Sequence, residues 1–126
     1  MKIKSPLRYP GGKSRALTTI LPLVPSFFEF REPFVGGGSV FMALKQLYPD
    51  KNFWINDINH DLICFWKAVR DDIVGLSDKV KSYKGTTDGK AMYLFILSML
   101  KDRSDELKLA LWFFVVNRIT FSGVME

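Results

Sequence analysis

The sequence is poor in the side chains that hold metals or form disulfides. Its 126 residues include one cysteine, Cys64, and one histidine, His60. A single cysteine excludes an internal disulfide and a cysteine-based zinc site, and a single histidine leaves little for another metal site. The sequence therefore predicts neither a disulfide nor a bound metal.

Long apolar segments are also missing. The longest apolar stretch, Leu109 to Val116, is far shorter than the about 20 residues that a membrane-spanning helix needs. Residues 1–15 are polar and basic and contain Pro6 and Pro10, so they do not resemble a secretory signal peptide. We therefore expect a soluble, cytoplasmic protein that has no membrane partner.

Acidic residues are absent from residues 1–15, which we call the N-terminal arm. No acid precedes Glu29, whereas the rest of the chain has as many basic as acidic residues, so the net charge of +5 comes from the arm. The basic residues of the arm are Lys2, Lys4, Arg8, Lys13 and Arg15. A basic arm fits a nucleic-acid partner, and the alternative is a solvated tail on a basic protein.

Hydrophobic periodicity and turn residues predict two strands and several helices. The strands are expected over residues 27–34 and 52–57, and Ser39 and Asn59 are expected helix N-caps. The helices are expected over residues 13–21, 39–48, the stretch that follows Asn59, 73–80, 91–100 and 106–117, with a polar loop over 85–89.

The order strand, glycine loop, helix, strand, helix is typical of the start of a doubly wound α/β sheet. Two parallel strands do not form a self-sufficient sheet, because buried parallel sheets need more strands and helices on both faces. The sequence therefore predicts an incomplete Rossmann-like α/β fold with a helical segment after its first strands.

The segment Glu-Pro-Phe-Val-Gly-Gly-Gly-Ser-Val-Phe at residues 32–41 is the main candidate site. Glycines at a strand-to-helix turn let a ligand approach the backbone and the helix N-terminus. Asp57 ends the second predicted strand, 21 residues after Gly36, and an acid at this distance accepts hydrogen bonds from ribose hydroxyls in nucleotide-binding folds. The alternative is a purely structural glycine turn.

If the glycine loop and Asp57 bind a ligand that contains ribose, we favour S-adenosylmethionine as that ligand. The dinucleotide pattern G-x-G-x-x-G fails at its third glycine, where Phe41 stands, and no pyrophosphate-binding pattern is found elsewhere. S-adenosylmethionine carries a cationic tail in place of phosphates, which tolerates the nearby Glu32. A fragment of a nucleotide-dependent oxidoreductase is the competing interpretation.

The arm contains a second motif, Arg-Tyr-Pro-Gly-Gly-Lys-Ser-Arg at residues 8–15. A P-loop is excluded, because Leu7 stands where its first glycine is required. The Gly-Gly turn would instead let Tyr9 pack on an adenine or a cationic tail, and let Lys13 meet a carboxylate or phosphate. The alternative is a core tyrosine beside a solvated lysine.

A third motif, Asn-Arg-Ile-Thr-Phe-Ser-Gly, follows the last apolar helix at residues 117–123. Asn117 and Arg118 could donate hydrogen bonds to bases and phosphates. Without further context, the segment is simply a helix end.

Together, Arg-Tyr-Pro-Gly-Gly-Lys, Glu-Pro-Phe-Val-Gly-Gly-Gly-Ser-Val-Phe and Asn-Asp-Ile-Asn resemble the opening motifs of adenine-specific DNA methyltransferases of the D12 (Dam-like) type. The resemblance implies N6-methylation of adenine in double-stranded DNA with S-adenosylmethionine as cofactor, and a companion restriction endonuclease in some systems. The resemblance assigns Tyr9, Lys13 and Asp57 to the cofactor. With the glycine loop, the predicted cofactor residues are Tyr9, Lys13, Glu32, Pro33, Phe34, Gly36, Gly37, Gly38 and Asp57, and the predicted DNA-binding residues are Arg8, Arg15, Asn117 and Arg118.

The catalytic motif of this family, (Asp/Asn)-Pro-Pro-(Tyr/Phe), is absent, because no two of the six prolines are adjacent. In this subgroup the motif follows the recognition region, so we expect it beyond Glu126 and expect no methyl transfer by these 126 residues alone. The resemblance assigns cofactor binding to residues 1–70, and assigns residues 71–126 to a helical segment leading into a truncated DNA-recognition region. A non-enzymatic, basic nucleic-acid-binding module is the remaining alternative.

Overall fold

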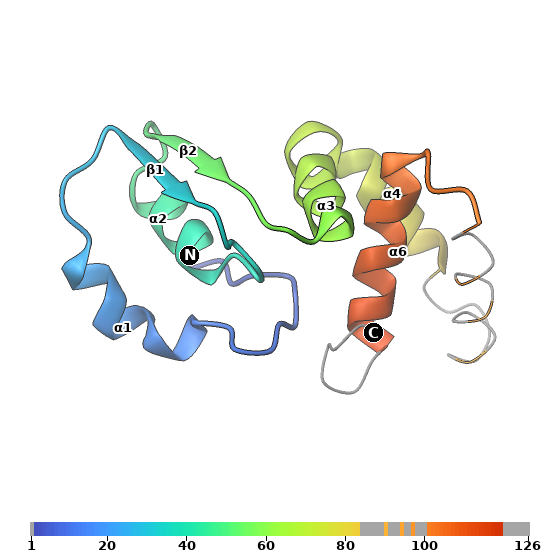
Figure 1. The fold of residues 1–126 in the computed structure, drawn as a ribbon, viewed down its shortest axis with the longest axis horizontal. Helices are drawn as coiled ribbons and strands as arrows, with labels where there is room; N and C mark the ends of the chain where they lie inside the picture. The colour runs from blue at the N-terminus through green and yellow to red at the C-terminus, as the bar shows by residue number, and fades with distance from the viewer. Residues whose placement is uncertain (1, 84–89, 91–93, 95–96, 98–100, 120–126) are drawn as a thin grey trace. The chain divides into compact units, whose positions relative to one another are not determined.

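The computed structural model describes residues 2–83, 90, 94, 97 and 101–119. The chain forms two compact units, Met1–Ile58 and Asn59–Glu126 (Figure 1). The first unit contains α1 (Leu17–Ile20), β1 (Glu29–Glu32), α2 (Ser39–Leu47) and β2 (Asn52–Ile55). The second contains α3 (His60–Asp71), α4 (Ile73–Tyr83) and α6 (Glu106–Ile119).

The two strands of the first unit pair in parallel, with Phe30 opposite Phe53. These two rings are half-buried on the face of the sheet that α2 covers, and the Phe41 ring of α2 lies 5.7 Å from the Phe53 ring, centroid to centroid. On the other face, the Arg31 guanidinium lies 5.9 Å from the centre of the exposed Trp54 ring. The predicted order of strand, glycine loop, helix and parallel strand is therefore confirmed.

Both strands are shorter than the predicted 27–34 and 52–57. The regular ladder ends at Glu32, whose carbonyl accepts a hydrogen bond from the Asn56 N–H at 2.9 Å. Pairing resumes for one position, where the Val35 N–H donates to the Asn56 carbonyl at 2.9 Å. This bond places the glycine loop beside the end of β2.

The predicted helix over residues 13–21 is wrong in its extent. α1 is a single turn, flanked by 3-10 turns at Ser14–Ala16 and Leu21–Leu23. No side chain caps the start of α1 or of either 3-10 turn. Pro22 also lacks one of the backbone N–H donors that would extend the helix.

The predicted N-cap at Ser39 is also wrong. Gly38 is the N-cap of α2 and has a φ angle of 75°, in the left-handed region that favours glycine. Its carbonyl accepts the first helical hydrogen bond, from Met42 N–H at 2.8 Å, so Ser39 is already inside the helix.

The core of the second unit lies where α3 packs against α6. Phe65 and Phe113 are fully buried there, and the Phe65 ring stacks on Phe114 at 5.8 Å between centroids. Asn59 caps α3 as predicted, because its Oδ1 accepts a hydrogen bond from Leu62 N–H at 3.2 Å.

The helices predicted over 73–80 and 106–117 are confirmed as α4 and α6. The predicted loop over 85–89 and most of the predicted helix over 91–100 lie outside the described residues. Within the described ranges, no helix has the length and apolar character needed to cross a membrane. The second compact unit begins at Asn59 and so includes α3. The predicted functional division into residues 1–70 and 71–126 stays a prediction.

Candidate functional site

The glycine loop between β1 and α2 is held in shape by backbone hydrogen bonds and by Asp57. Gly36 and Gly38 have φ angles of 51° and 75°, which side chains with a Cβ rarely adopt. The Gly36 N–H donates to Asp57 Oδ2 at 3.0 Å, and the Gly38 N–H donates to the Val35 carbonyl at 2.9 Å. The carboxylate beyond β2 therefore fixes the start of the loop.

The Tyr9 ring packs directly on this loop. A Cβ added at Gly36 would lie 2.9 Å from Tyr9 Cε1, and one added at Gly37 would lie 2.8 Å from Tyr9 Cβ. Both distances are below van der Waals contact, so these two glycines make room for the tyrosine. The sequence had suggested that the glycines make room for a ligand, and the structure shows that a side chain of the arm already fills part of that space.

The N-terminal arm is docked on the first unit rather than extended as a tail. The Ile3 backbone N–H donates to Gln46 Oε1 at 2.7 Å, and Gln46 Nε2 donates back to the Ile3 carbonyl at 2.8 Å. The Ser5 hydroxyl donates to the Gly37 carbonyl, and Leu7 is buried. The arm is thus positioned so that Tyr9 reaches the loop, while its basic side chains Lys2, Lys4, Arg8, Lys13 and Arg15 stay exposed.

A pocket of about 330 Å³, counted with its open mouth, lies between the arm and the glycine loop. The enclosed part of the pocket, about 60 Å³, is smaller than the about 300–1,000 Å³ typical of complete small-molecule sites, so the described residues form one side of an open site. The lining residues are Tyr9, Gly11, Gly12, Lys13, Glu32, Phe34, Val35, Gly36, Gly37, Gly38, Ser39 and Val40. The pocket thus brings together most of the predicted cofactor residues. Pro33 and Asp57 are not among the lining residues, but Asp57 accepts a hydrogen bond from Gly36, which is.

Glu32 gives this pocket a negatively charged acceptor. Its side chain is half-buried, and among the described residues its Oε2 atom is buried without a hydrogen-bond partner. Burial raises the pKa of Glu32, while the positive charge of Lys13 and a backbone hydrogen bond from Phe41 act in the opposite direction. An unpaired buried carboxylate oxygen is costly, and a ligand that donates a hydrogen bond or carries positive charge would remove that cost.

Tyr9 contributes a neutral hydroxyl. Burial and the negative charge of Asp57 raise the pKa of Tyr9 above its ordinary value, so the phenol keeps its proton at neutral pH. Phe34 is 78% exposed and adds a flat apolar face to the same pocket. The site therefore combines aromatic surface with carboxylate acceptors, which suits a ligand with a flat ring, hydroxyl donors and an amino group.

The predicted DNA-binding residues are found in both units. Arg8 and Arg15 are exposed in the first unit, and Arg118 is exposed in the second, with its guanidinium 5.5 Å from the centre of the Phe114 ring. Asn117, in contrast, is fully buried in the second unit, with 0% of its surface exposed. The DNA contact of Asn117 stays a prediction, and among the described residues its side chain is not exposed. The rest of the predicted motif, residues 120–123, lies outside the described residues.

A second group of side chains was missed from the sequence. His60, Cys64 and Glu106 place one potential metal-ligand atom each within 4.8 Å of the others. Residue counts alone predict no metal, whereas the i, i+4 spacing of His60 and Cys64 places both side chains on one face of a helix. Nothing in the sequence connects these two residues with Glu106, because only the packing of α6 on α3 brings it close.

Comparison with known proteins assigns the family. The sequence profile of the D12 class N6 adenine-specific DNA methyltransferases matches residues 9–126. The chain belongs to this family. The match begins at Tyr9 and spans the glycine loop and Asp57, so the pocket described above lies within the family region.

Several relatives have the corresponding names. The type II methyltransferase M.MjaIII of Methanocaldococcus jannaschii is 30% identical over 98% of this chain and 48% of its own length. A DNA adenine methylase of Vibrio cholerae is 29% identical over 94% of the chain and 42% of its own length. A DNA N-6-adenine-methyltransferase of Escherichia phage P1 is 31% identical over 96% of the chain and 16% of its own length. The chain thus spans about half, or less, of each relative that it matches.

Proposed function

We propose that this chain supplies the S-adenosylmethionine-binding part of a site-specific DNA adenine-N6 methyltransferase. The observation that carries the proposal is the pocket at the glycine loop, where the buried Glu32 Oε2 has no partner among the described residues and Tyr9 and Asp57 lie beside the loop. Family membership supplies the reaction class, and the pocket supplies the place where the methyl donor would bind.

The charge of the pocket supports S-adenosylmethionine over a dinucleotide. Glu32 lies at the N-terminus of α2, where dinucleotide-binding folds hold a pyrophosphate. Two negative groups at one helix end repel each other in a partly buried site. An ammonium group has the opposite effect, because it would donate to the unpaired Oε2 atom. The competing oxidoreductase interpretation is therefore disfavoured by Glu32 as well as by Phe41.

Each polar group of the pocket has a role in this proposal. Glu32 would accept from the amino group of the cofactor, and the exposed Lys13 would meet its carboxylate. Asp57 would accept from the ribose hydroxyls, as the acid that follows the second strand does in nucleotide-binding folds. Phe34 and Tyr9 would pack on the adenine or the cationic tail, and Pro33 with Gly36, Gly37 and Gly38 would shape the loop around it.

The exposed arginines are the proposed DNA contacts. Arg8, Arg15 and Arg118 would bind phosphates of double-stranded DNA. Asn117 remains a proposed DNA-binding residue, and its burial at the end of α6 fits a role in positioning Arg118. A Rossmann-like sheet completed by further strands, a cytoplasmic location and a companion restriction endonuclease belong to the same proposal.

In the proposed reaction, the N6 nitrogen of adenine attacks the methyl group of the sulfonium, the sulfur–carbon bond breaks, and the nitrogen loses a proton to solvent. The residues of this chain bind and orient the donor, which is where proximity contributes to the rate. The polarisation of the adenine amino group requires the family motif (Asp/Asn)-Pro-Pro-(Tyr/Phe), which is not among these 126 residues.

The test is transfer of a labelled methyl group to duplex DNA. The protein encoded by the complete reading frame is expected to form N6-methyladenine, whereas the 126 residues alone are expected to form none. Methylation of cytosine, or no methylation by a folded protein that carries the catalytic motif, would overturn the proposal. A competition assay adds a second readout, because S-adenosylhomocysteine should displace the donor and NAD should not.

A further inference from the structure

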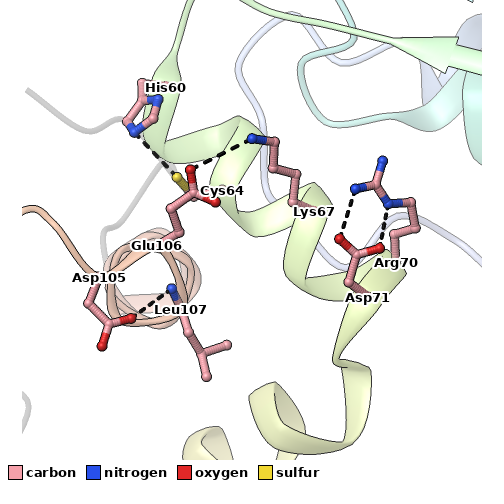
Figure 2. Close-up of polar contacts among 8 residues, drawn as sticks. All are labelled: His60, Cys64, Lys67, Arg70, Asp71, Asp105, Glu106 and Leu107. Carbon is pink, nitrogen blue, oxygen red and sulfur yellow. Dashed lines mark hydrogen bonds and ion pairs between the residues drawn. The ribbon is translucent and has the colours of Figure 1, made fainter.

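His60, Cys64 and Glu106 meet in the second unit, at the starts of two helices. His60 is the first residue of α3, Cys64 lies one turn later on the same helix, and Glu106 is the first residue of α6. Figure 2 shows the imidazole and the thiol pointing toward the Glu106 carboxylate. The three side chains offer a nitrogen, a sulfur and an oxygen, and each is a ligand type that binds zinc.

The distances fit a tetrahedral ion. With Zn–S of about 2.3 Å and Zn–N of about 2.0–2.1 Å, tetrahedral angles place sulfur and nitrogen about 3.5 Å apart. The distance from Cys64 Sγ to His60 Nε2 is 3.5 Å. The third ligand atom, on Glu106, lies within 4.8 Å of both and needs to move by about an ångström to complete three vertices.

The surroundings of the cluster permit that movement. The Glu106 side chain is 54% exposed, and its Oε1 atom lies 3.7 Å from Lys67 Nζ, which is a loose ion pair. Cys64 is 1% exposed, and Asp61 is paired with Arg103. The carboxylate can therefore turn from the lysine toward an ion, while the buried thiol keeps water away from one side of the site.

The charges beside the thiol favour a cation, because the Glu106 and Asp61 carboxylates both act on Cys64. Burial and these two negative charges raise the pKa of Cys64, while Lys67 and Arg103 act in the opposite direction, so an ion that binds here must displace the thiol proton. A bound divalent ion reverses this balance, because it stabilises the thiolate directly.

We propose that His60, Cys64 and Glu106 bind one Zn²⁺ ion, with a water molecule as the fourth ligand. Binding forms the Zn–S bond and releases the thiol proton to solvent. The ion joins the start of α3 to the start of α6, the two helices that form the core of the second unit, and so it stabilises that unit. This site is separate from the proposed cofactor pocket, whose residues belong to the first unit.

The experiment uses the chain without an affinity tag, freed of metal with a chelator and titrated with Zn²⁺ alone. We expect one equivalent to bind. Titration with Co²⁺ should give a thiolate-to-metal charge-transfer band, and Cys64 is the only cysteine that can produce it. Cys64→Ser should abolish this band. Loss of a group that only orients a metal ligand typically weakens metal binding by about 10–100-fold. His60→Ala and Glu106→Gln each remove a ligand, so each should weaken Zn²⁺ binding by more than that.

Asp105→Asn is the matched control. Asp105 is an exposed carboxylate next to Glu106, and its Oδ1 caps α6 by accepting from Leu107 N–H at 3.0 Å, a bond that asparagine can also make. Zn²⁺ binding should be unchanged in this variant. His60 and Glu106 are exposed, so their variants carry the test even if Cys64→Ser fails to fold. Absence of the Co²⁺ band, or equal Zn²⁺ affinity in wild type, His60→Ala and Glu106→Gln, would overturn the proposal.

Discussion

Replacement of Gly36 by alanine tests the packing that shapes the cofactor pocket. The new Cβ would lie 2.9 Å from Tyr9 Cε1, and the residue would have to keep a φ angle of 51°. The left-handed backbone costs about 1–2 kcal/mol for a residue with a Cβ. Displacement of the Tyr9 ring adds about 1–3 kcal/mol, as other overpacked sites do. We therefore expect Gly36→Ala to lower the free energy of unfolding by about 2–5 kcal/mol.

Gly11→Ala separates the two contributions. Gly11 also has a positive φ angle, 70°, but a Cβ there meets nothing within 4 Å. This variant should lose only the backbone term, about 1–2 kcal/mol. Urea unfolding followed by circular dichroism measures both variants. In a Tyr9→Ala background the obstructing ring is absent, so the additional cost of Gly36→Ala over Gly11→Ala should disappear.

Equal destabilisation by Gly36→Ala and Gly11→Ala in the presence of Tyr9 would refute this reasoning. It would mean that the Tyr9 ring does not rest on the loop in solution. An additional cost that persists in the Tyr9→Ala background would show that the close contact at Gly36 comes from another group.

Three further predictions concern charge, capping and the core. Glu32→Gln should raise the free energy of unfolding at neutral pH. Burial raises the pKa of Glu32 in the folded protein above its pKa in the unfolded chain. The protonated Glu32 side chain therefore stabilises the fold below the unfolded pKa, and this stabilisation is lost as the pH rises through the folded pKa. Urea unfolding across that pH range should show a weaker pH dependence in the variant, and an unchanged pH profile would contradict the assignment. Asn59→Ala should cost about 0.5–2 kcal/mol through loss of the α3 cap, whereas the exposed Asn52→Ala should cost little; equal effects would argue against the cap. Phe113→Ala should cost about 3–5 kcal/mol and Phe28→Ala, at a ring that is 93% exposed, should have little effect on the same measurement; the reverse order would place the core elsewhere.

Local chemistry made the central elements predictable. The glycine turn, the strands around it and the Asn59 cap depend on residues that are close in sequence, and the structure confirms each of them. The Ser39 cap was predicted wrongly for an equally local reason. A serine is a good cap in general, but Gly38 can adopt the left-handed angle that ends the turn one residue earlier.

Features that depend on distant contacts could not be predicted. The docking of the arm requires Gln46 to meet Ile3, 43 residues away, and no periodicity signals this pair. The burial of Asn117 follows from the packing of α6, whereas the sequence shows only a polar residue at a helix end. The approach of Glu106 to His60 and Cys64 has the same origin, which is why the residue counts gave no indication of a metal site.

Calorimetric titration of S-adenosylmethionine tests the central proposal most directly, with wild type, Asp57→Ala and Asp50→Ala measured side by side. The account predicts one site in wild type and about tenfold or more weaker binding in Asp57→Ala, since a hydrogen bond to a charged group contributes about 1.5–3 kcal/mol. The exposed Asp50 precedes β2 and serves as the control, and its variant should bind as wild type does. Equal affinity in wild type and Asp57→Ala, or no binding by the folded wild-type chain, would contradict the account.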